Sequence, residues 1–148
     1  MKSMKELVEW IEKHREWCFD LMRIYLGIGL LVKGFYFLWQ PDYVASLVME
    51  SGTYSAWNTL LVHYVALGHI AGGLLMALGM ITRVGAVIQL PILFGAVFLI
   101  HLKEGLFAKD QSLEFSALVL FLVCLIAVYG SGTLSLDHYL EKKRISET

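Results

Sequence analysis

Residues 114–137, EFSALVLFLVCLIAVYGSGTLSLD, form the stretch that decides the fold. Leu118 to Tyr129 contain no charged residue and no proline, and with its flanks this segment is about long enough to cross a bilayer. A carboxylate, Glu114, stands at its head, although an unpaired carboxylate is costly to bury in a membrane. Three further apolar segments precede this one. The sequence therefore predicts a small integral membrane protein whose ionisable residues need a structural or functional reason.

The composition of the whole chain agrees with this reading. Of its 148 residues 57% are hydrophobic and only 17% are charged, and the mean hydropathy is +0.64. A soluble domain of this length carries more charge and spreads its apolar residues with amphipathic spacing. We therefore predict an all-α fold, an integral membrane four-helix bundle with spans at 18–39, 57–80, 84–102 and 113–130.

The two ends of the chain are polar. Residues 1–17 are typical of an amphipathic helix lying in the membrane interface, residues 18–138 form the transmembrane domain, and residues 139–148 are a polar tail. Eight Lys and Arg residues lie in the N-terminal arm, the link at Arg83 and the tail, against only Lys103 and Lys109 on the other side. The positive-inside rule then predicts that both termini are cytoplasmic.

Several classes of function are disfavoured by what the sequence lacks. No basic stripe with interleaved aromatic residues is present, which argues against nucleic acid as a partner. Cys18 and Cys124 lie on different predicted helices and form no C-x-x-C pair, which argues against thiol–disulfide exchange by this chain alone. No nucleophile elbow, phosphate loop, carboxylate dyad or zinc spacing occurs. We predict no metal site and no intrinsic cofactor.

The ionisable residues within the spans predict a polar site. With a rise of about 1.5 Å per residue, Lys33, His63, His101 and Glu114 fall at one level in the outer half of the bundle, with His69 deeper. Ionisable residues inside a membrane usually face the bundle interior and pair with one another. We predict an outward-facing pocket in which Lys33, His63 and His69 bind a ligand, with Glu114 and His101 as its catalytic groups.

Each of these residues also has a structural explanation. Lys33 can snorkel towards the headgroups, and His63 can bond to a backbone carbonyl. His101 and Glu114 can cap the charged link between the last two spans, where a carboxylate also suits the helix dipole. A haem with two histidine ligands would need His101 opposite one histidine of the second span, because His63 and His69 point about 120° apart on one helix.

Two features predict how the helices are held together. Arg23, inside the first span, has two candidate partners: Asp20 at i, i+3, and Asp137 after the Gly-Ser-Gly break. We predict a structural ion pair between Arg23 and Asp137 that clamps the tail against the first helix, with Asp20 as the alternative acid. Gly68 and Gly72 are spaced to let a neighbouring helix backbone approach closely.

Three motifs, taken in order, resemble the DoxX family of membrane proteins. The first motif, Arg23-x-x-Leu26-Gly27 followed by Gly34, resembles the opening of the family. The second, HIAGGLLMALGMITRVGA from His69, resembles its G-G-x-L-x-x-x-G-x-x-T/S-R-x-x-A stretch. The third, E-x-S-A-L from Glu114 with G-x-G-x-x-S-L-D from Gly130, is similar to its ending. The resemblance spans about residues 20–138. His69 stands where the family often has an acidic residue, and Phe37 stands where it often has a basic one.

The resemblance implies a four-helix bundle of the bacterial inner membrane. Related members are linked to thiosulfate oxidation with quinone as acceptor, and others to oxidoreductase complexes that handle thiol or oxidative stress. The leading hypothesis is thus a redox-linked membrane subunit in which Lys33, His63 or His101 bonds a quinone oxygen and Glu114 transfers the proton. A redox partner protein would supply the electrons.

The rival hypothesis is a non-enzymatic accessory or assembly protein that docks a partner through the glycine-rich face at Gly68 and Gly72. If this chain's own helices covered that face, the observation would count against the accessory-protein hypothesis. A small transporter is disfavoured because no inverted repeat is visible. The sequence leaves homo-oligomerisation open.

Overall fold

The computed structural model describes residues 4, 6, 9–10, 15–48, 56–103, 105 and 112–146. Its helices are α2 (Arg15–Trp39), α3 (Pro41–Val48), α4 (Ala56–Leu78), α5 (Thr82–Gly95), α6 (Ser112–Tyr129) and α7 (Leu136–Ser146), and α5 continues through a π-helical turn η1 (Ala96–Ile100) and a 3-10 turn η2 (His101–Lys103). Within these residues four helical stretches are long and apolar enough to cross a membrane: Glu16–Trp39, Leu60–Leu78, Thr82–Lys103 and Ser112–Tyr129. The all-α four-helix membrane fold is confirmed.

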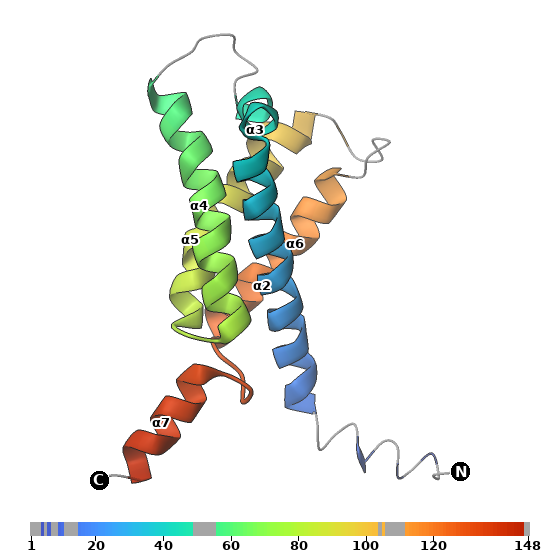
Figure 1. Cartoon of the computed structure of the whole chain (residues 1–148). Helices are drawn as coiled ribbons and strands as arrows, with labels where there is room; N and C mark the ends of the chain where they lie inside the picture. The colour runs from blue at the N-terminus through green and yellow to red at the C-terminus, as the bar shows by residue number, and fades with distance from the viewer. Residues whose placement is uncertain are drawn as a thin grey trace.

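The polar ends of the chain flank the four spans. The predicted interfacial helix over 1–17 lies largely outside the described residues. The C-terminal tail forms the exposed helix α7, which hydropathy alone does not indicate because its residues are mostly polar. The start of α2 and helix α7 lie at the same end of the bundle (Figure 1), as an even number of spans requires.

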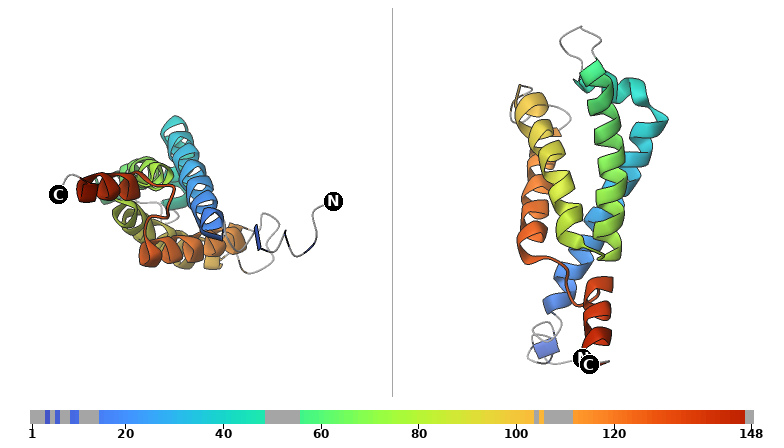
Figure 2. Two further views of the ribbon diagram at one scale, coloured as in Figure 1. Left: turned by 90° about the horizontal axis from the view of Figure 1, so that it is seen from below. Right: turned by 90° about the vertical axis from the view of Figure 1, so that its left-hand side faces the viewer.

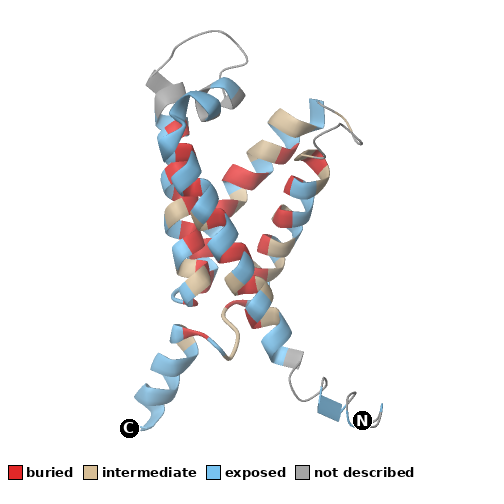
Figure 3. Ribbon diagram, turned by 45° about the vertical axis from the view of Figure 1, so that its right-hand side comes forward, coloured by how far each residue is buried: buried red, intermediate tan, exposed pale blue. Residues whose placement is uncertain are grey.

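The four long helices pack in a row that curves on itself. Close backbone contacts join α2 to α4, α4 to α5, and α5 to α6. Near the end that carries α7, α2 also meets α6, where the rings of Phe19 and Tyr129 pack edge to face with centroids 6.0 Å apart. The α2/α4 pair and the α5/α6 pair separate towards the end that carries α3 (Figures 2 and 3).

The buried residues show the same division. One apolar cluster draws on all four long helices; its members are Leu26, Leu30, Met76, Ala86, Leu93, Val119, Val123 and Ile126. A second cluster, Phe37, Val62 and Ala66, contains residues of α2 and α4 alone. Because Phe37 lies nearer the α3 end than Leu30 does, α2 and α4 continue as a pair beyond the shared core.

Glycines make the closest helix contacts. A Cβ on Gly73 would lie 2.6 Å from the backbone nitrogen of Leu31, so α4 and α2 touch backbone to backbone. A Cβ on Gly72 would lie 2.8 Å from the carbonyl oxygen of Gly85, and one on Gly68 would overlap the side chain of Ile92. Small residues let membrane helices pack without a hydrophobic driving force. The Gly68/Gly72 face is thus covered by α5 of the same chain.

Arg23 is fully buried at the α7 end of the four-helix core. Its Nη1 donates to the carbonyl oxygen of Met76 and, at 3.4 Å, to that of Ala77. Its Nη2 donates to Asp20 Oδ1 at 3.3 Å and to the carbonyl oxygen of Leu134 at 2.8 Å. A single guanidinium therefore ties α2 to the end of α4 and to the loop before α7.

Asp20 holds the same loop from the other side. Its fully buried Oδ2 accepts hydrogen bonds from the hydroxyl of Thr133 at 3.0 Å and from the backbone N–H of Leu134 at 2.9 Å. Gly132 lies directly against this carboxylate, where a Cβ would overlap it. The glycine after the Gly-Ser break is therefore required by close approach, and the loop is clamped onto α2.

The acid paired with Arg23 is Asp20 and not Asp137, so the predicted Arg23–Asp137 pair is wrong in its acid. Asp137 instead caps the start of α5: Oδ1 accepts from the N–H of Ile81 at 2.8 Å and Oδ2 from the N–H of Thr82 at 3.3 Å. The loop before α7 instead places the carbonyl oxygen of Leu134, three positions before Asp137, against the Arg23 guanidinium. Thus a clamp on the tail exists, with backbone groups and Asp20 as its partners.

Two matched glycine substitutions test the helix contacts. A Cβ at Gly27 would lie 2.8 Å from the carbonyl oxygen of Gly73, whereas one at Gly29 meets nothing within 4 Å. Gly27→Ala is expected to destabilise the protein by about 1–3 kcal/mol through overpacking. Gly29→Ala on the same helix is expected to be neutral or slightly stabilising. Thermal unfolding in detergent, followed by circular dichroism, compares them; equal melting temperatures would contradict the packing.

The clamp gives a second prediction. Asp20→Asn leaves the buried guanidinium of Arg23 without its counter-charge, and removing one partner of a buried pair costs about 3–5 kcal/mol. Asp42→Asn, which neutralises an exposed carboxylate in the first turn of α3, is the control and should cost at most about 1 kcal/mol. Thermal unfolding measures both. Faster proteolysis within the 131–135 loop of Asp20→Asn should accompany the loss, and equal stability of the two variants would refute the clamp.

Candidate functional site

Lys33 lies on the face of α2 that contacts the rest of the bundle. Leu26, Leu30, Lys33 and Phe37 follow one another at spacings of three or four residues and so share one side of the helix. Leu26, Leu30 and Phe37 are buried, whereas Lys33 is exposed. The difference arises because the shared four-helix core ends near Leu30, and beyond it α2 packs in the α2/α4 cluster. Lys33 therefore stands where the two helix pairs separate.

His69 is the buried histidine of α4, with only 3% of its surface exposed. Its Nδ1 lies 2.9 Å from the carbonyl oxygen of Val65, one turn earlier. A carbonyl can only accept, so this bond assigns the ring proton of the neutral histidine to Nδ1 and leaves Nε2 as an acceptor. No described residue donates to Nε2.

The ring of Phe37 joins these two groups. The Nζ atom of Lys33 lies 5.6 Å from the centroid of the Phe37 ring, within cation–π range. The ring of His69 packs edge to face against the same phenyl ring, with centroids 5.4 Å apart. Among the described residues Lys33 has no hydrogen-bond or carboxylate partner. We refer to Lys33, Phe37 and His69 as the Lys33–His69 site.

Gln89 of α5 supports this site from behind. Its fully buried Nε2 donates to the carbonyl oxygen of Gly68 at 3.0 Å and to that of His69 at 3.4 Å. Its Oε1 is buried with no partner among the described residues. A Cβ on Gly72 would lie 2.8 Å from Nε2, so this glycine makes room for the amide. An amide in the middle of an apolar span is the signal that could have indicated this role.

The other predicted site residues lie elsewhere. His63 is exposed on α4, consistent with a direction about 120° from His69. His101 is half-buried in η2, and Glu114 is half-buried in the first turn of α6. Since η2 packs against α6, these two residues belong to the α5/α6 side of the bundle. The structure brings Lys33 and His69 together, and the convergence of His101 and Glu114 with them stays a prediction.

The chemistry of the Lys33–His69 site follows from its donors and acceptors. It offers an ammonium with three N–H donors, one imidazole nitrogen that accepts, and an apolar ring between them. Such a set suits a flat, apolar molecule that carries oxygen atoms. The described residues contain no group of three or more His, Cys, Asp or Glu side chains placed to hold a metal ion.

The comparisons with known proteins give the family. The chain has no significant similarity to any curated protein or solved structure. A family model described as DoxX matches residues 19–102, which run from α2 to η2 and include Lys33, His69 and Gln89. This match covers more than half of the chain. Together with the four apolar helices, it shows that the chain is a multi-pass membrane protein of the DoxX family.

Proposed function

We propose that the protein is a redox-linked subunit of the bacterial cytoplasmic membrane that binds a quinone, or a similar lipid-soluble molecule, in the Lys33–His69 site. The observation that carries the proposal is that the Lys33 ammonium and the buried His69 imidazole contact the same phenyl ring inside the spans. Neither Lys33 Nζ nor His69 Nε2 is hydrogen-bonded to a described residue. In this proposal both termini face the cytoplasm, as the distribution of Lys and Arg predicts.

Lys33 supplies the donor that a quinone carbonyl oxygen requires. A charged side chain within a membrane span is costly unless it pairs or faces a polar cavity. The cation–π contact with Phe37 offsets part of that cost and leaves the N–H groups available. A hydrogen bond from this ammonium to a ligand oxygen therefore satisfies a group that the described residues leave without a hydrogen-bond partner.

His69 supplies the complementary acceptor. Bound quinone would accept two electrons and two protons from a reductant. The Nδ1–H bond to Val65 fixes the imidazole tautomer, so Nε2 accepts a hydrogen bond from a ligand hydroxyl and can hold a proton. The Gln89 bonds to the carbonyl oxygens of Gly68 and His69 hold this turn of α4 against α5.

The helix arrangement gives a lipid-soluble ligand a route to the site. The α2/α4 and α5/α6 pairs separate towards the α3 end (Figure 3). Lys33 is exposed on α2 between Leu30 of the shared core and Phe37 of the α2/α4 cluster. A ligand that partitions into the bilayer could reach Lys33 sideways, without crossing the aqueous phase. In the proposal His101 and Glu114 remain the candidates for proton transfer from the α5/α6 side, and a partner protein supplies the electrons.

The accessory-protein alternative loses its distinguishing feature. It required the Gly68/Gly72 face to be open to a partner, but Ile92 and Gln89 of α5 occupy that face. A partner that bound there would first have to displace α5. The redox-subunit proposal needs no such rearrangement.

Lys33 gives the first test of the proposal. Lys33→Met removes a charged donor, which contributes about 1.5–3 kcal/mol, so the affinity for an oxidised short-chain ubiquinone should fall about 10- to 100-fold. The saturable part of tryptophan fluorescence quenching in detergent micelles measures the dissociation constant. Lys33→Arg should retain most of the affinity. Lys142→Met on the exposed helix α7 is the control, and a Lys33→Met variant that binds like this control would reject the site.

His69 gives a test with a different signature. His69→Asn can keep a donor to the Val65 carbonyl but removes Nε2, so thermal stability should change little. Its affinity for the reduced, hydroxyl-bearing ubiquinol should fall about 3- to 10-fold, as expected for a neutral hydrogen bond, while the oxidised form is less affected. The same fluorescence-quenching measurement, made with the oxidised and with the reduced form, separates the two outcomes. Equal affinity of wild type and variant for the reduced form would remove His69 from the mechanism.

A further inference from the structure

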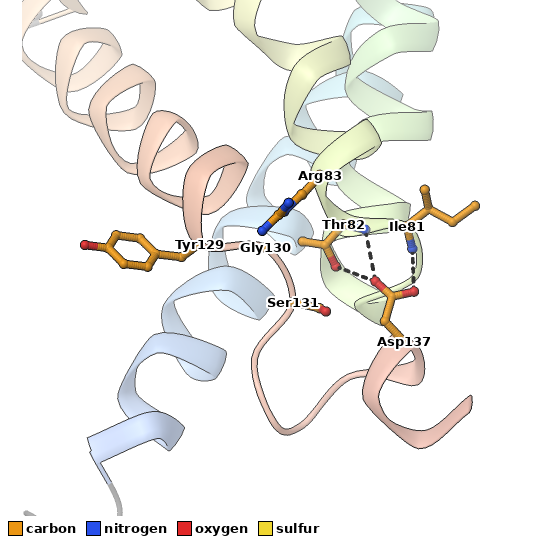
Figure 4. Close-up of a pocket in the computed structure, with 7 residues that line it drawn as sticks. All are labelled: Ile81, Thr82, Arg83, Tyr129, Gly130, Ser131 and Asp137. Atoms are coloured by element: carbon orange, nitrogen blue, oxygen red, sulfur yellow. Dashed lines mark hydrogen bonds between the residues drawn. The ribbon is translucent and has the colours of Figure 1, made fainter. Parts of the chain in front are cut away.

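A second polar site lies at the opposite end of the bundle from α3. A cavity of about 370 Å³ opens between the start of α5, the end of α6 and the start of α7. Its lining residues are Ile81, Thr82, Arg83, Tyr129, Gly130, Ser131 and Asp137 (Figure 4). This volume is in the range of small-molecule sites. None of these residues belongs to the Lys33–His69 site.

Arg83 is the cationic group of this cavity. Its guanidinium lies over Gly130, where a Cβ would approach Nε to 3.0 Å (Figure 4). Gly130 has a φ of +84°, so the chain turns away after α6 without a side chain that would displace Arg83. Among the described residues Arg83 has neither a hydrogen bond nor an ion pair.

The acid of the cavity does not neutralise Arg83. The two carboxylate oxygens of Asp137 bond to the N–H groups of Ile81 and Thr82 and to the hydroxyl of Thr82. These bonds also occupy the start of α5, so the positive end of that helix is not part of the site. Ser131 faces the same cavity, and neither its hydroxyl nor its backbone N–H has a partner among the described residues. Arg83 and Ser131 therefore present N–H and O–H donors to the cavity that have no partner among the described residues.

The level of the cavity in the membrane indicates what these donors meet. Thr82 begins one membrane span and Tyr129 ends another, so the cavity lies at the boundary between the hydrocarbon and the headgroups. Tyr129 is 69% exposed there, as tyrosines often are at a membrane interface. Phosphate groups of phospholipids lie at this depth. An arginine fork with nearby N–H and O–H donors matches phosphate geometry.

We propose that this cavity binds a phosphate group, with the Arg83 guanidinium as its charged ligand and Ser131 as a second donor. A membrane phospholipid and a soluble phosphate ester share this chemistry, and the experiment below distinguishes them. A bound headgroup would pack between α5, α6 and the loop that the Asp20–Arg23 clamp holds. The site is separate from the proposed quinone site and stands without it.

The experiment uses the full chain purified in mild detergent. Native mass spectrometry measures the binding of phosphatidylglycerol, with a diacylglycerol of the same acyl chains as the probe that lacks phosphate. In a second arm, sn-glycerol 3-phosphate and inorganic phosphate are tested for a shift of the melting temperature. The variants are Arg83→Gln, the matched control Arg144→Gln on α7, and Ser131→Ala, which removes only a hydroxyl.

The expected result is binding of phosphatidylglycerol but not of diacylglycerol by the wild type and by Arg144→Gln. Arg83→Gln should weaken this binding at least about tenfold, and Ser131→Ala by about two- to fivefold. Stabilisation by glycerol 3-phosphate alone, dependent on Arg83, would identify a soluble ester as the source. Binding that is the same in Arg83→Gln and Arg144→Gln would overturn the proposal. If Arg83→Gln does not fold, unchanged binding by Ser131→Ala together with no response of the wild type to soluble phosphate overturns it.

Discussion

The burial of one guanidinium controls the α7 end of this protein. Arg23 lies inside the bundle with no exposed surface, and the cost of removing its charge from water is met by groups from three segments. Asp20 supplies the counter-charge from α2, the end of α4 supplies two carbonyl oxygens, and the loop before α7 supplies a third at residue 134. These segments can satisfy Arg23 only when they are together, so the clamp fixes where α4 ends and where the chain leaves α6.

The close helix contacts follow from the same absence of water. Inside a bilayer, apolar side chains gain little by leaving lipid for protein, so helices associate through near contact and hydrogen bonds. Gly73 brings α4 against α2, Gly72 brings it against α5, and Gln89 crosses the second interface to the carbonyl oxygens of Gly68 and His69. These contacts hold α4 against α2 and against the part of α5 that runs up to Ile92. The glycine contacts between α4 and α5 lie at Gly68 and Gly72, and beyond them the two helix pairs part towards the α3 end.

The sequence predicts the four spans well because the thickness of the bilayer requires about 20 consecutive apolar residues in each spanning helix. This requirement does not depend on tertiary contacts. The sequence also places Arg23 in a clamp on the tail. The sequence does not show whether Asp20 or Asp137 pairs with Arg23, because that depends on the path of the loop after Gly130. Nor does it show which histidine faces inward: His63 and His69 are both polar residues of one span, and only the packing of α4 on α2 and α5 buries the second. The role of Gln89 depends on how α5 is rotated about its axis, and the Arg83 cavity depends on where α5, α6 and α7 begin or end. Residue spacing alone determines neither.

The Asp20–Arg23 clamp and the Lys33–His69 site differ in how completely their polar groups are satisfied. At the clamp Asp20, both terminal nitrogens of Arg23 and the neighbouring Asp137 have partners within the chain, as expected of groups that maintain structure. The Nε atom of Arg23 is buried with no partner among the described residues. In the middle, Lys33 and His69 Nε2 have none among the described residues, and the Oε1 atom of Gln89 is buried without one. Unsatisfied polar groups in a membrane are expensive, so a fold that needed them only for packing would gain by replacing them with apolar side chains. Their presence beside the opening between the two helix pairs is what the proposed binding site for an oxygen-bearing apolar molecule requires.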